Sequence, residues 1–120
     1  MARYQHLPLF QKTYAFSKEI FLLKSNLPKS LKHDLGGDLF ASVLRCIKLI
    51  VFANGQKVRG KALTELGLEI QVQWVYLRLL HDLKAISAGQ FRELSEKLAE
   101  ISPQVNAWKS WDDKQARGVK

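Results

Sequence analysis

Residues 59–86 read RGKALTELGLEIQVQWVYLRLLHDLKAI, contain no proline, and decide the fold. One set of apolar side chains recurs at steps of three or four residues, the period of one helix face: Leu63, Leu66, Ile70, Trp74 and Leu77. A second set lies about 100° further round the same helix: Leu68, Val72, Val75, Leu79 and Leu83. A helix that is apolar on several sides is buried on several sides. We therefore expect this helix to lie at the centre of a bundle, or to bury its second stripe against another copy of the chain.

The composition favours a single globular domain. The chain has 120 residues, 47% of them hydrophobic, which is enough for one core without covalent staples. Cys46 is the only cysteine, so a disulfide within the chain is impossible and a reducing compartment is favoured. The neighbours of Cys46 are apolar, which indicates a packed core thiol and not a nucleophile.

The sequence gives no sign of export or membrane insertion. The N-terminal residues lack the continuous apolar core of a signal peptide. The most apolar region, residues 39–53, is interrupted by Arg45 and Lys48 and is shorter than the ~20 residues of a membrane span. We expect a soluble, cytoplasmic protein.

Two further helices are predicted before the central stretch. Pro8 opens the first, which ends near Ser25 or Asn26 because Pro28 disfavours helical geometry in the residue before it. Ser30 is a good N-cap for a second helix running from about Leu31 to Ala53. The glycine pair at residues 36–37 is unfavourable inside a helix, and predicts that a neighbouring helix approaches closely there.

A fourth helix follows the central one. Ser87 and Gln90 match a capping box. Pro103 interrupts an apolar period that continues to Trp111, which predicts a kink or a short break. Residues 112–120 lack periodicity and are predicted to be a disordered tail. The fold class is therefore all-α: an antiparallel up-down four-helix bundle in one domain, residues 1–111.

Nothing in the sequence is a strong catalytic or metal-binding signal. His6, His33 and His81 have no partners at the spacing of a known metal motif, so we expect no metal and no cofactor. Glu65 and Glu69 share one helix face with Lys61, a pattern more typical of a solvated, salt-bridged strip than of an acid/base pair. We expect no catalytic residues and no enzymatic activity.

The basic residues are more informative. The net charge is +8, which favours a polyanionic partner, nucleic acid first and an anionic membrane second. No acidic residue occurs between Asp38 and Glu65, where several cations gather around one end of the predicted hairpin. The candidate nucleic-acid-binding residues are Arg45, Lys48, Lys57, Arg59, Lys61 and, further along the third helix, Arg78. The alternative is an ordinary solvated rim of cations.

The chain as a whole resembles a known family. The stretches that carry the resemblance are LPKSLKHDLGGDLF (27–40), FANGQK (52–57), VYLRLLHDLKAISAGQFRELSEKLAEI (75–101) and WKSW (108–111). Together they resemble the accessory variability determinant proteins of diversity-generating retroelements, within the four-helix-bundle group that includes the proteins encoded in 23S rRNA intervening sequences. The resemblance runs from about Leu7 to Trp111. Where the family tends to carry a Gly-Arg-rich EIGRxxGGW segment, residues 100–108 read EISPQVNAW, which removes an arginine.

The resemblance implies a basic, barrel-like homopentamer of four-helix bundles. It also implies binding to nucleic acid and to the element's reverse transcriptase, in support of mutagenic template copying, and no catalytic residues. Our first hypothesis is therefore a non-catalytic partner of a reverse transcriptase that binds RNA or DNA. The second is a structural bundle for protein association, with the charge incidental. The third is a small hydrolase.

Overall fold

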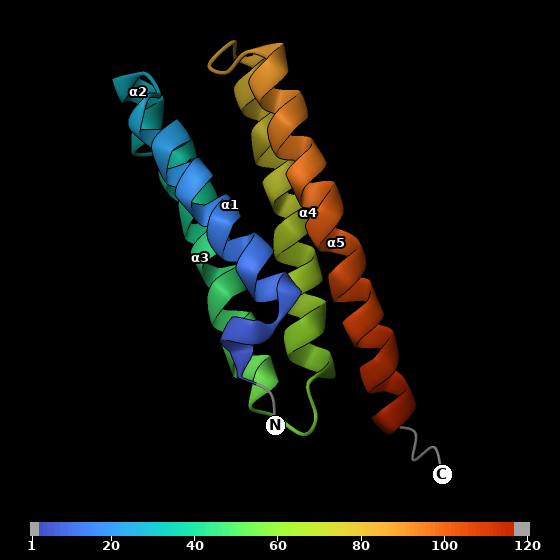
Figure 1. The fold of residues 1–120 in the computed structure, drawn as a ribbon. Coiled ribbons are helices and arrows are strands. Elements are labelled where there is room, and N and C mark those ends of the chain that lie inside the picture. The colour runs from blue at the N-terminus through green and yellow to red at the C-terminus, as the bar shows by residue number, and fades with distance from the viewer. Residues whose placement is uncertain (1–2, 117–120) are drawn as a thin grey trace.

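The computed structural model describes residues 3–116 as an elongated bundle of antiparallel helices (Figure 1). Its elements are η1 (Tyr4–His6), α1 (Pro8–Ser25), α2 (Lys29–Lys32), α3 (Leu35–Asn54), α4 (Gly60–Asp82) and α5 (Ala88–Ala116). The four long helices alternate in direction along a rod of 54 × 21 × 20 Å, and no strand occurs in this part of the chain. The predicted all-α, up-down four-helix bundle is confirmed.

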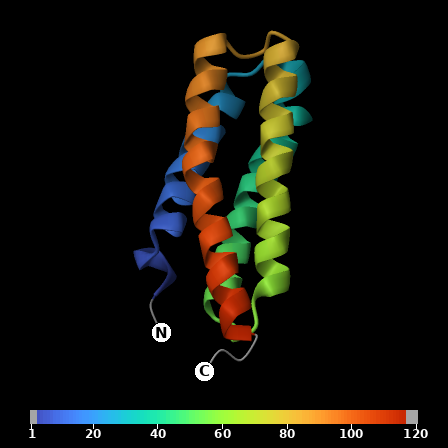
Figure 2. The ribbon, with the colours of Figure 1, turned by 90° about the vertical axis from the view of Figure 1, so that its right-hand side faces the viewer.

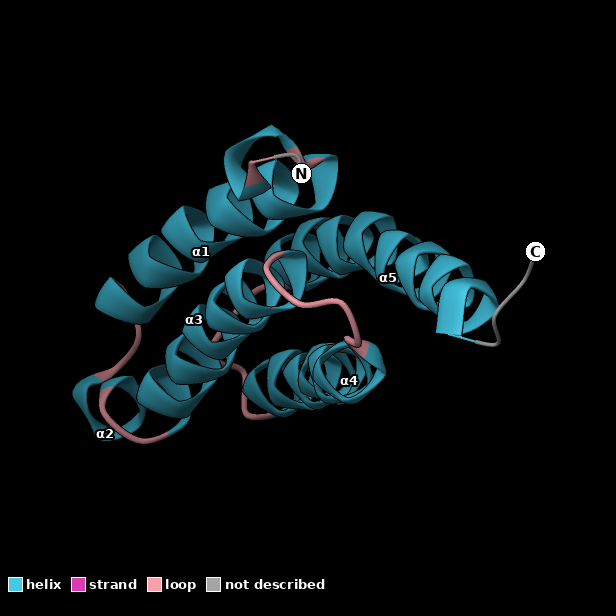
Figure 3. Ribbon diagram, turned by 90° about the horizontal axis from the view of Figure 1, so that it is seen from below, coloured by secondary structure: helices cyan, strands magenta, loops and turns pink. Residues whose placement is uncertain are grey.

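The helices form a four-cornered arrangement. α3 packs against α1 and α4, and α5 packs against α4 and, less extensively, α1 (Figure 3). α4 therefore occupies a corner of the bundle, and the prediction that it lies at the centre is wrong. The reason is topological, because each helix in an up-down bundle has only two close neighbours.

α4 buries one of its two apolar stripes. Leu63, Leu66, Ile70 and Leu77 are almost fully buried, and Trp74 packs against the core from its edge. The second stripe faces outward: Leu68 is 62% exposed, Val75 64%, Leu79 39% and Leu83 52%. The single chain therefore leaves an apolar face on α4 uncovered. An uncovered face is what we expect if a second copy of the chain buries this stripe.

The connection between α1 and α3 differs from the sequence prediction. The N–H groups of Leu31 and Lys32 both donate to the Pro28 carbonyl at 2.9 Å, which closes α2 as a separate short helix. The next helix then begins at Leu35, so the predicted start at Leu31 is wrong, and Ser30 lies inside α2 where it caps no helix.

The glycine pair contributes one close approach. A Cβ on Gly36 would lie 2.9 Å from Leu27 Cδ1 and 3.2 Å from Lys24 Cγ. The C-terminal end of α1 and the residues just after it therefore pack directly on the α3 backbone. A Cβ on Gly37 would meet nothing nearer than the Lys32 carbonyl at 3.9 Å. The predicted close approach is confirmed for the first glycine only.

α5 is longer than predicted. The capping box at its start is confirmed, with Ser87 N–H donating to Gln90 Oε1 at 2.8 Å and Gln90 N–H donating to Ser87 Oγ at 3.0 Å. The helix continues through Pro103 without a break, so the predicted short break is wrong. Pro103 and Ala99, whose carbonyl loses its partner to the proline, are both exposed residues.

The end of α5 corrects the predicted tail. Residues 112–116 are helical, and the Asp112 side chain is buried, because it contacts Arg59 at the start of α4. The remainder of the predicted tail, residues 117–120, lies outside the described residues. Within residues 3–116 no helix is both long and apolar enough to cross a lipid bilayer.

Candidate nucleic-acid interface

One end of the bundle gathers several lysines that have no acidic partner. The C-terminal third of α3, residues 55–59, the first turn of α4 and the last turns of α5 lie at this end of the rod (Figures 1 and 2). Five lysines on these segments make no ion pair with any described residue: Lys48, Lys57, Lys61, Lys109 and Lys114. We call this region the basic end. Its exposed carboxylates are Glu65 and Asp113, so its lysines outnumber them.

Sequence reasoning identified three of these lysines and missed the two on α5. Lys48, Lys57 and Lys61 were candidates and are exposed. Lys114 was missed because residues 112–120 were expected to be disordered, and Lys109 because nothing near it in the sequence connects the end of α5 with the cations at residues 45–61. The WKSW stretch was the available signal, since its two tryptophans predict that α5 packs to its end.

Arg59 is held inside the protein. Its side chain is 13% exposed, and its Nε lies 3.6 Å from Oδ1 of Asp112, which is 4% exposed. The guanidinium also donates to the Gln56 carbonyl, through Nε at 3.1 Å and through Nη2. The guanidinium carbon lies 5.8 Å from the ring centroid of Trp108 and 5.5 Å from that of Trp111, which are cation–π distances. Arg59 therefore fixes the end of α5 to the start of α4.

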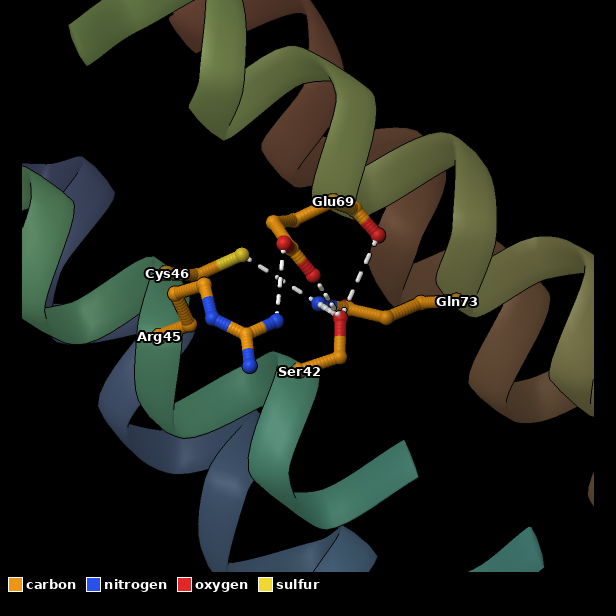
Figure 4. A network of polar contacts seen from close by, with 5 residues as sticks. All are labelled: Ser42, Arg45, Cys46, Glu69 and Gln73. Atoms are coloured by element: carbon orange, nitrogen blue, oxygen red, sulfur yellow. Dashed lines mark hydrogen bonds and ion pairs between the residues drawn. The ribbon is translucent and has the colours of Figure 1, made fainter. Parts of the chain in front are cut away.

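Arg45 belongs to a polar network between α3 and α4 (Figure 4). Its Nη1 donates to Glu69 Oε2 at 2.9 Å, and Ser42 Oγ donates to the other carboxylate oxygen at 2.6 Å. The hydrogen bond to Glu69 raises the pKa of Arg45. Glu69 is thus bound across to α3, and the expected solvated strip with Lys61 is wrong at this residue.

The buried part of the network fixes Gln73 and Cys46. Gln73 is 1% exposed, and its Nε2 donates to Ser42 Oγ at 3.0 Å and to Cys46 Sγ at 3.2 Å. Burial raises the pKa of the Cys46 thiol to about 12, so the sulfur is a neutral thiol at physiological pH. The predicted core packing of Cys46 is confirmed.

Arg78 does not join the basic end. It lies about 25 Å further along α4 than Lys61 at ~1.5 Å per residue. Its Nε is 3.9 Å from Asp82 Oδ2, and both side chains are exposed. The structure therefore brings Lys48, Lys57 and Lys61 to one end, holds Arg45 and Arg59 in ion pairs, and leaves Arg78 apart.

The described residues hold no cluster of metal ligands. No group of three or more His, Cys, Asp or Glu side chains between residues 3 and 116 is placed to hold a metal ion. The His81 ring stacks on Phe91 with centroids 4.9 Å apart, which gives it a packing role between α4 and α5.

Comparison with known proteins identifies the family. A family model described as bAvd-like matches residues 7–111, which is most of the chain. No match was found among curated proteins. No solved structure matched either. The matched range begins at the residue before α1 and ends within α5, so it covers α1 to α4 and most of α5. The chain therefore belongs to the bAvd-like family, the accessory variability determinant-like proteins of diversity-generating retroelements.

Proposed function

We propose that this chain is a non-catalytic accessory protein that binds the backbone of RNA or DNA and the reverse transcriptase of its retroelement, in support of mutagenic template copying. The observation that carries the nucleic-acid part is the group of unpaired lysines at the basic end of a chain with a net charge of +8. Lysines without acidic partners are available to phosphates, and phosphate contacts supply affinity without reading sequence.

We propose further that several copies assemble side by side, as the family's homopentamer does. The outward stripe of α4 supplies one apolar face. A second, chemically different face lies on α1 and α3, where Phe21 and Leu22 are exposed and Phe21 packs on Phe40 with ring centroids 5.4 Å apart. These side chains line a hollow of about 380 Å³. Two unlike faces favour a head-to-tail contact, which closes into a ring when the rotation allows.

Assembly would multiply the basic end. In a ring of parallel copies each chain contributes the same lysines to one rim, so the field that a polyanion meets grows with the number of subunits. A shared rim would also explain how a chain of 13.7 kDa holds a nucleic acid while it contacts a polymerase.

The central experiment is a fluorescence anisotropy titration against labelled RNA, DNA and a hybrid, repeated over a range of salt concentrations. Lys57→Glu/Lys61→Glu should weaken binding by more than about tenfold and flatten the salt dependence, because each lost phosphate contact removes about 0.7 to 0.9 from the slope. The matched control is Lys29→Glu/Lys84→Glu, which makes the same charge change at the opposite end of the rod. It should retain most of the affinity.

The outcomes separate the hypotheses. If the wild-type protein shows no salt-dependent binding, its charge is incidental and the chain is a structural association module. If both double variants lose affinity equally, binding is spread over the surface and the basic end is not the site.

The remaining parts of the proposal have their own measurements. Light scattering should give five times 13.7 kDa for the wild type and a lower mass for Leu68→Lys/Val75→Lys, whose side chains are exposed in the single chain. Co-purification with the element's own reverse transcriptase tests the protein partner, and failure to recover the polymerase would remove it from the proposal.

A further inference from the structure

Trp111 is an exposed aromatic residue at the basic end, in the last turns of α5. Its side chain is 51% exposed, whereas Trp74 and Trp108 pack against the core. The Arg59 guanidinium carbon lies 5.5 Å from its ring centroid. Arg59 therefore covers one face of the indole ring, and the exposed half of the side chain is open to solvent.

The ring is held in place from inside the protein. Arg59 is fixed by the Asp112 carboxylate at 3.6 Å and by the Gln56 carbonyl, and it also lies over Trp108 at 5.8 Å. These contacts orient the guanidinium before any ligand arrives. A ligand that stacks on Trp111 would therefore meet an ordered surface and lose little conformational entropy on binding.

Three lysines lie close along the chain to the residues that contact this ring, or on its own helix face. Lys57 and Lys61 flank Arg59 in the sequence, and Lys61 lies beside Gly60, whose Cβ position is 3.9 Å from Asp112 Oδ2. Lys114 follows Trp111 by three residues in α5, which places both on one helix face. An exposed aromatic ring bordered by lysines matches the chemistry of a single-stranded nucleic acid, in which bases stack while phosphates contact cations.

We propose that Trp111 is a stacking platform for an unpaired nucleobase, with the phosphates of that strand lying on Lys57, Lys61 and Lys114. The inference rests on the proposed function and narrows its ligand to a segment with unpaired bases. Every base has a π-face, so the platform is indifferent to sequence. A base inside a duplex is already stacked between its neighbours, so Trp111 adds nothing to duplex binding.

The test uses the full chain and two probes of about 12 nucleotides, within the usual site size for such surfaces. One is a thymidine single strand and the other is an abasic chain with the same phosphates. Trp111→Leu should weaken binding of the thymidine strand by about 5- to 100-fold, the loss expected for one stacked base. It should leave the abasic chain and the salt slope unchanged, because no phosphate contact is removed. Trp111→Phe retains a ring and should recover most of the affinity.

A second measurement reports base stacking directly and not through affinity. A single strand that carries the fluorescent base 2-aminopurine should lose fluorescence on binding the wild-type protein, and the loss should fall sharply with Trp111→Leu. Circular dichroism of each variant checks that α5 remains folded, which the exposure of the residue favours.

Several results would overturn the inference. Equal weakening of the thymidine and abasic probes would show that Trp111 acts only by positioning cations. Unchanged binding by Trp111→Leu, beside lost binding by Lys57→Glu/Lys61→Glu, would reject the platform while the proposed function stands. A wild-type protein that binds neither probe would reject both.

Discussion

Arg59 at the start of α4 and Asp112 near the end of α5 form an ion pair with 3.6 Å between Nε and Oδ1, and both side chains are almost excluded from water. Two tryptophan rings and the Gln56 carbonyl enclose the guanidinium. The contact joins the first turn of α4 to the last turns of α5, two segments that are far apart in the sequence, at a helix end that would otherwise fray. Two properties of the protein therefore depend on it: the length of α5 and the order of the basic end.

Removing the carboxylate should destabilise the protein. Asp112→Asn leaves the Arg59 charge buried without its counter-charge, and breaking one side of a buried pair costs about 3 to 5 kcal/mol. The Gln56 carbonyl remains, so we expect the lower part of that range in urea unfolding. The neighbouring exposed carboxylate gives a matched control, since Asp113→Asn should have no measurable effect. A similar loss in both variants would contradict a structural role for this pair.

The glycines of α3 and α4 should respond in opposite directions to alanine. A Cβ on Gly36 would lie 2.9 Å from Leu27 Cδ1 and 3.3 Å from the Leu31 carbonyl oxygen, so the buried Leu27 side chain must shift. We expect Gly36→Ala to destabilise the fold by about 1 kcal/mol, the lower end of the overpacking range. A Cβ on Gly67, inside α4, meets nothing within 4 Å, so Gly67→Ala should stabilise the fold by about 1 kcal/mol through helix propensity. Thermal unfolding of both variants decides the matter. Stabilisation by Gly36→Ala would show that α1 does not press on α3 as described.

Lys84 occupies a backbone conformation that favours glycine. Its φ is 62°, immediately after α4, and its N–H donates to the His81 carbonyl while the Ala85 N–H reaches back to Leu80. Left-handed geometry costs a residue with a Cβ roughly 1 to 2 kcal/mol, partly offset by the greater freedom of glycine in the unfolded chain. Lys84→Gly should therefore raise the unfolding free energy by about 0.5 to 1 kcal/mol. Lys84→Ala keeps the Cβ and should bring no such gain, which makes it the control.

Cys46 should make stability depend on alkaline pH. Its pKa is raised from an ordinary value of 9.0 to about 12 in the folded chain, chiefly by burial. The folded state then holds a proton that the unfolded state releases, so the contribution is complete below pH 9.0 and is lost as the pH rises toward 12. In that window the wild type should lose about 1.4 kcal/mol per pH unit more than Cys46→Ser. Parallel curves for the two proteins would contradict the assignment.

The same raised pKa predicts that Cys46 is alkylated slowly in the folded protein. Alkylation requires the thiolate, which is scarce in the folded state at neutral pH. Reaction of Cys46 with iodoacetamide should therefore proceed through the small unfolded population, and its rate should rise in urea in step with the loss of helical signal.

The parts of the fold that the sequence predicted are those with a local signature. The inner stripe of α4 was visible because Leu63, Leu66 and Ile70 repeat at the period of a helix. The Ser87–Gln90 cap was visible because both partners lie within one turn. Such features need no knowledge of any other helix.

The features that were missed depend on partners far along the chain. Asp112 looked like the start of a polar tail, because nothing near it in the sequence reveals that its carboxylate forms an ion pair with Arg59. Glu69 matched a strip with Lys61 on its own helix, but Ser42 and Arg45 on α3 bind it instead. The lysines of the basic end were therefore predicted where they are clustered in the sequence, and missed where α5 brings them from a distant part of the chain.

The 54 Å length of the rod sets a scale for anything that spans it. A double helix rises about 3.4 Å per base pair, so a duplex lying parallel to the helices would need about 16 base pairs to run from the lysine-bearing tip to the α2 tip. A duplex shorter than this reaches one tip alone. A polymerase docked at the α2 tip would be separated from the lysine-bearing tip by about one and a half turns of that duplex.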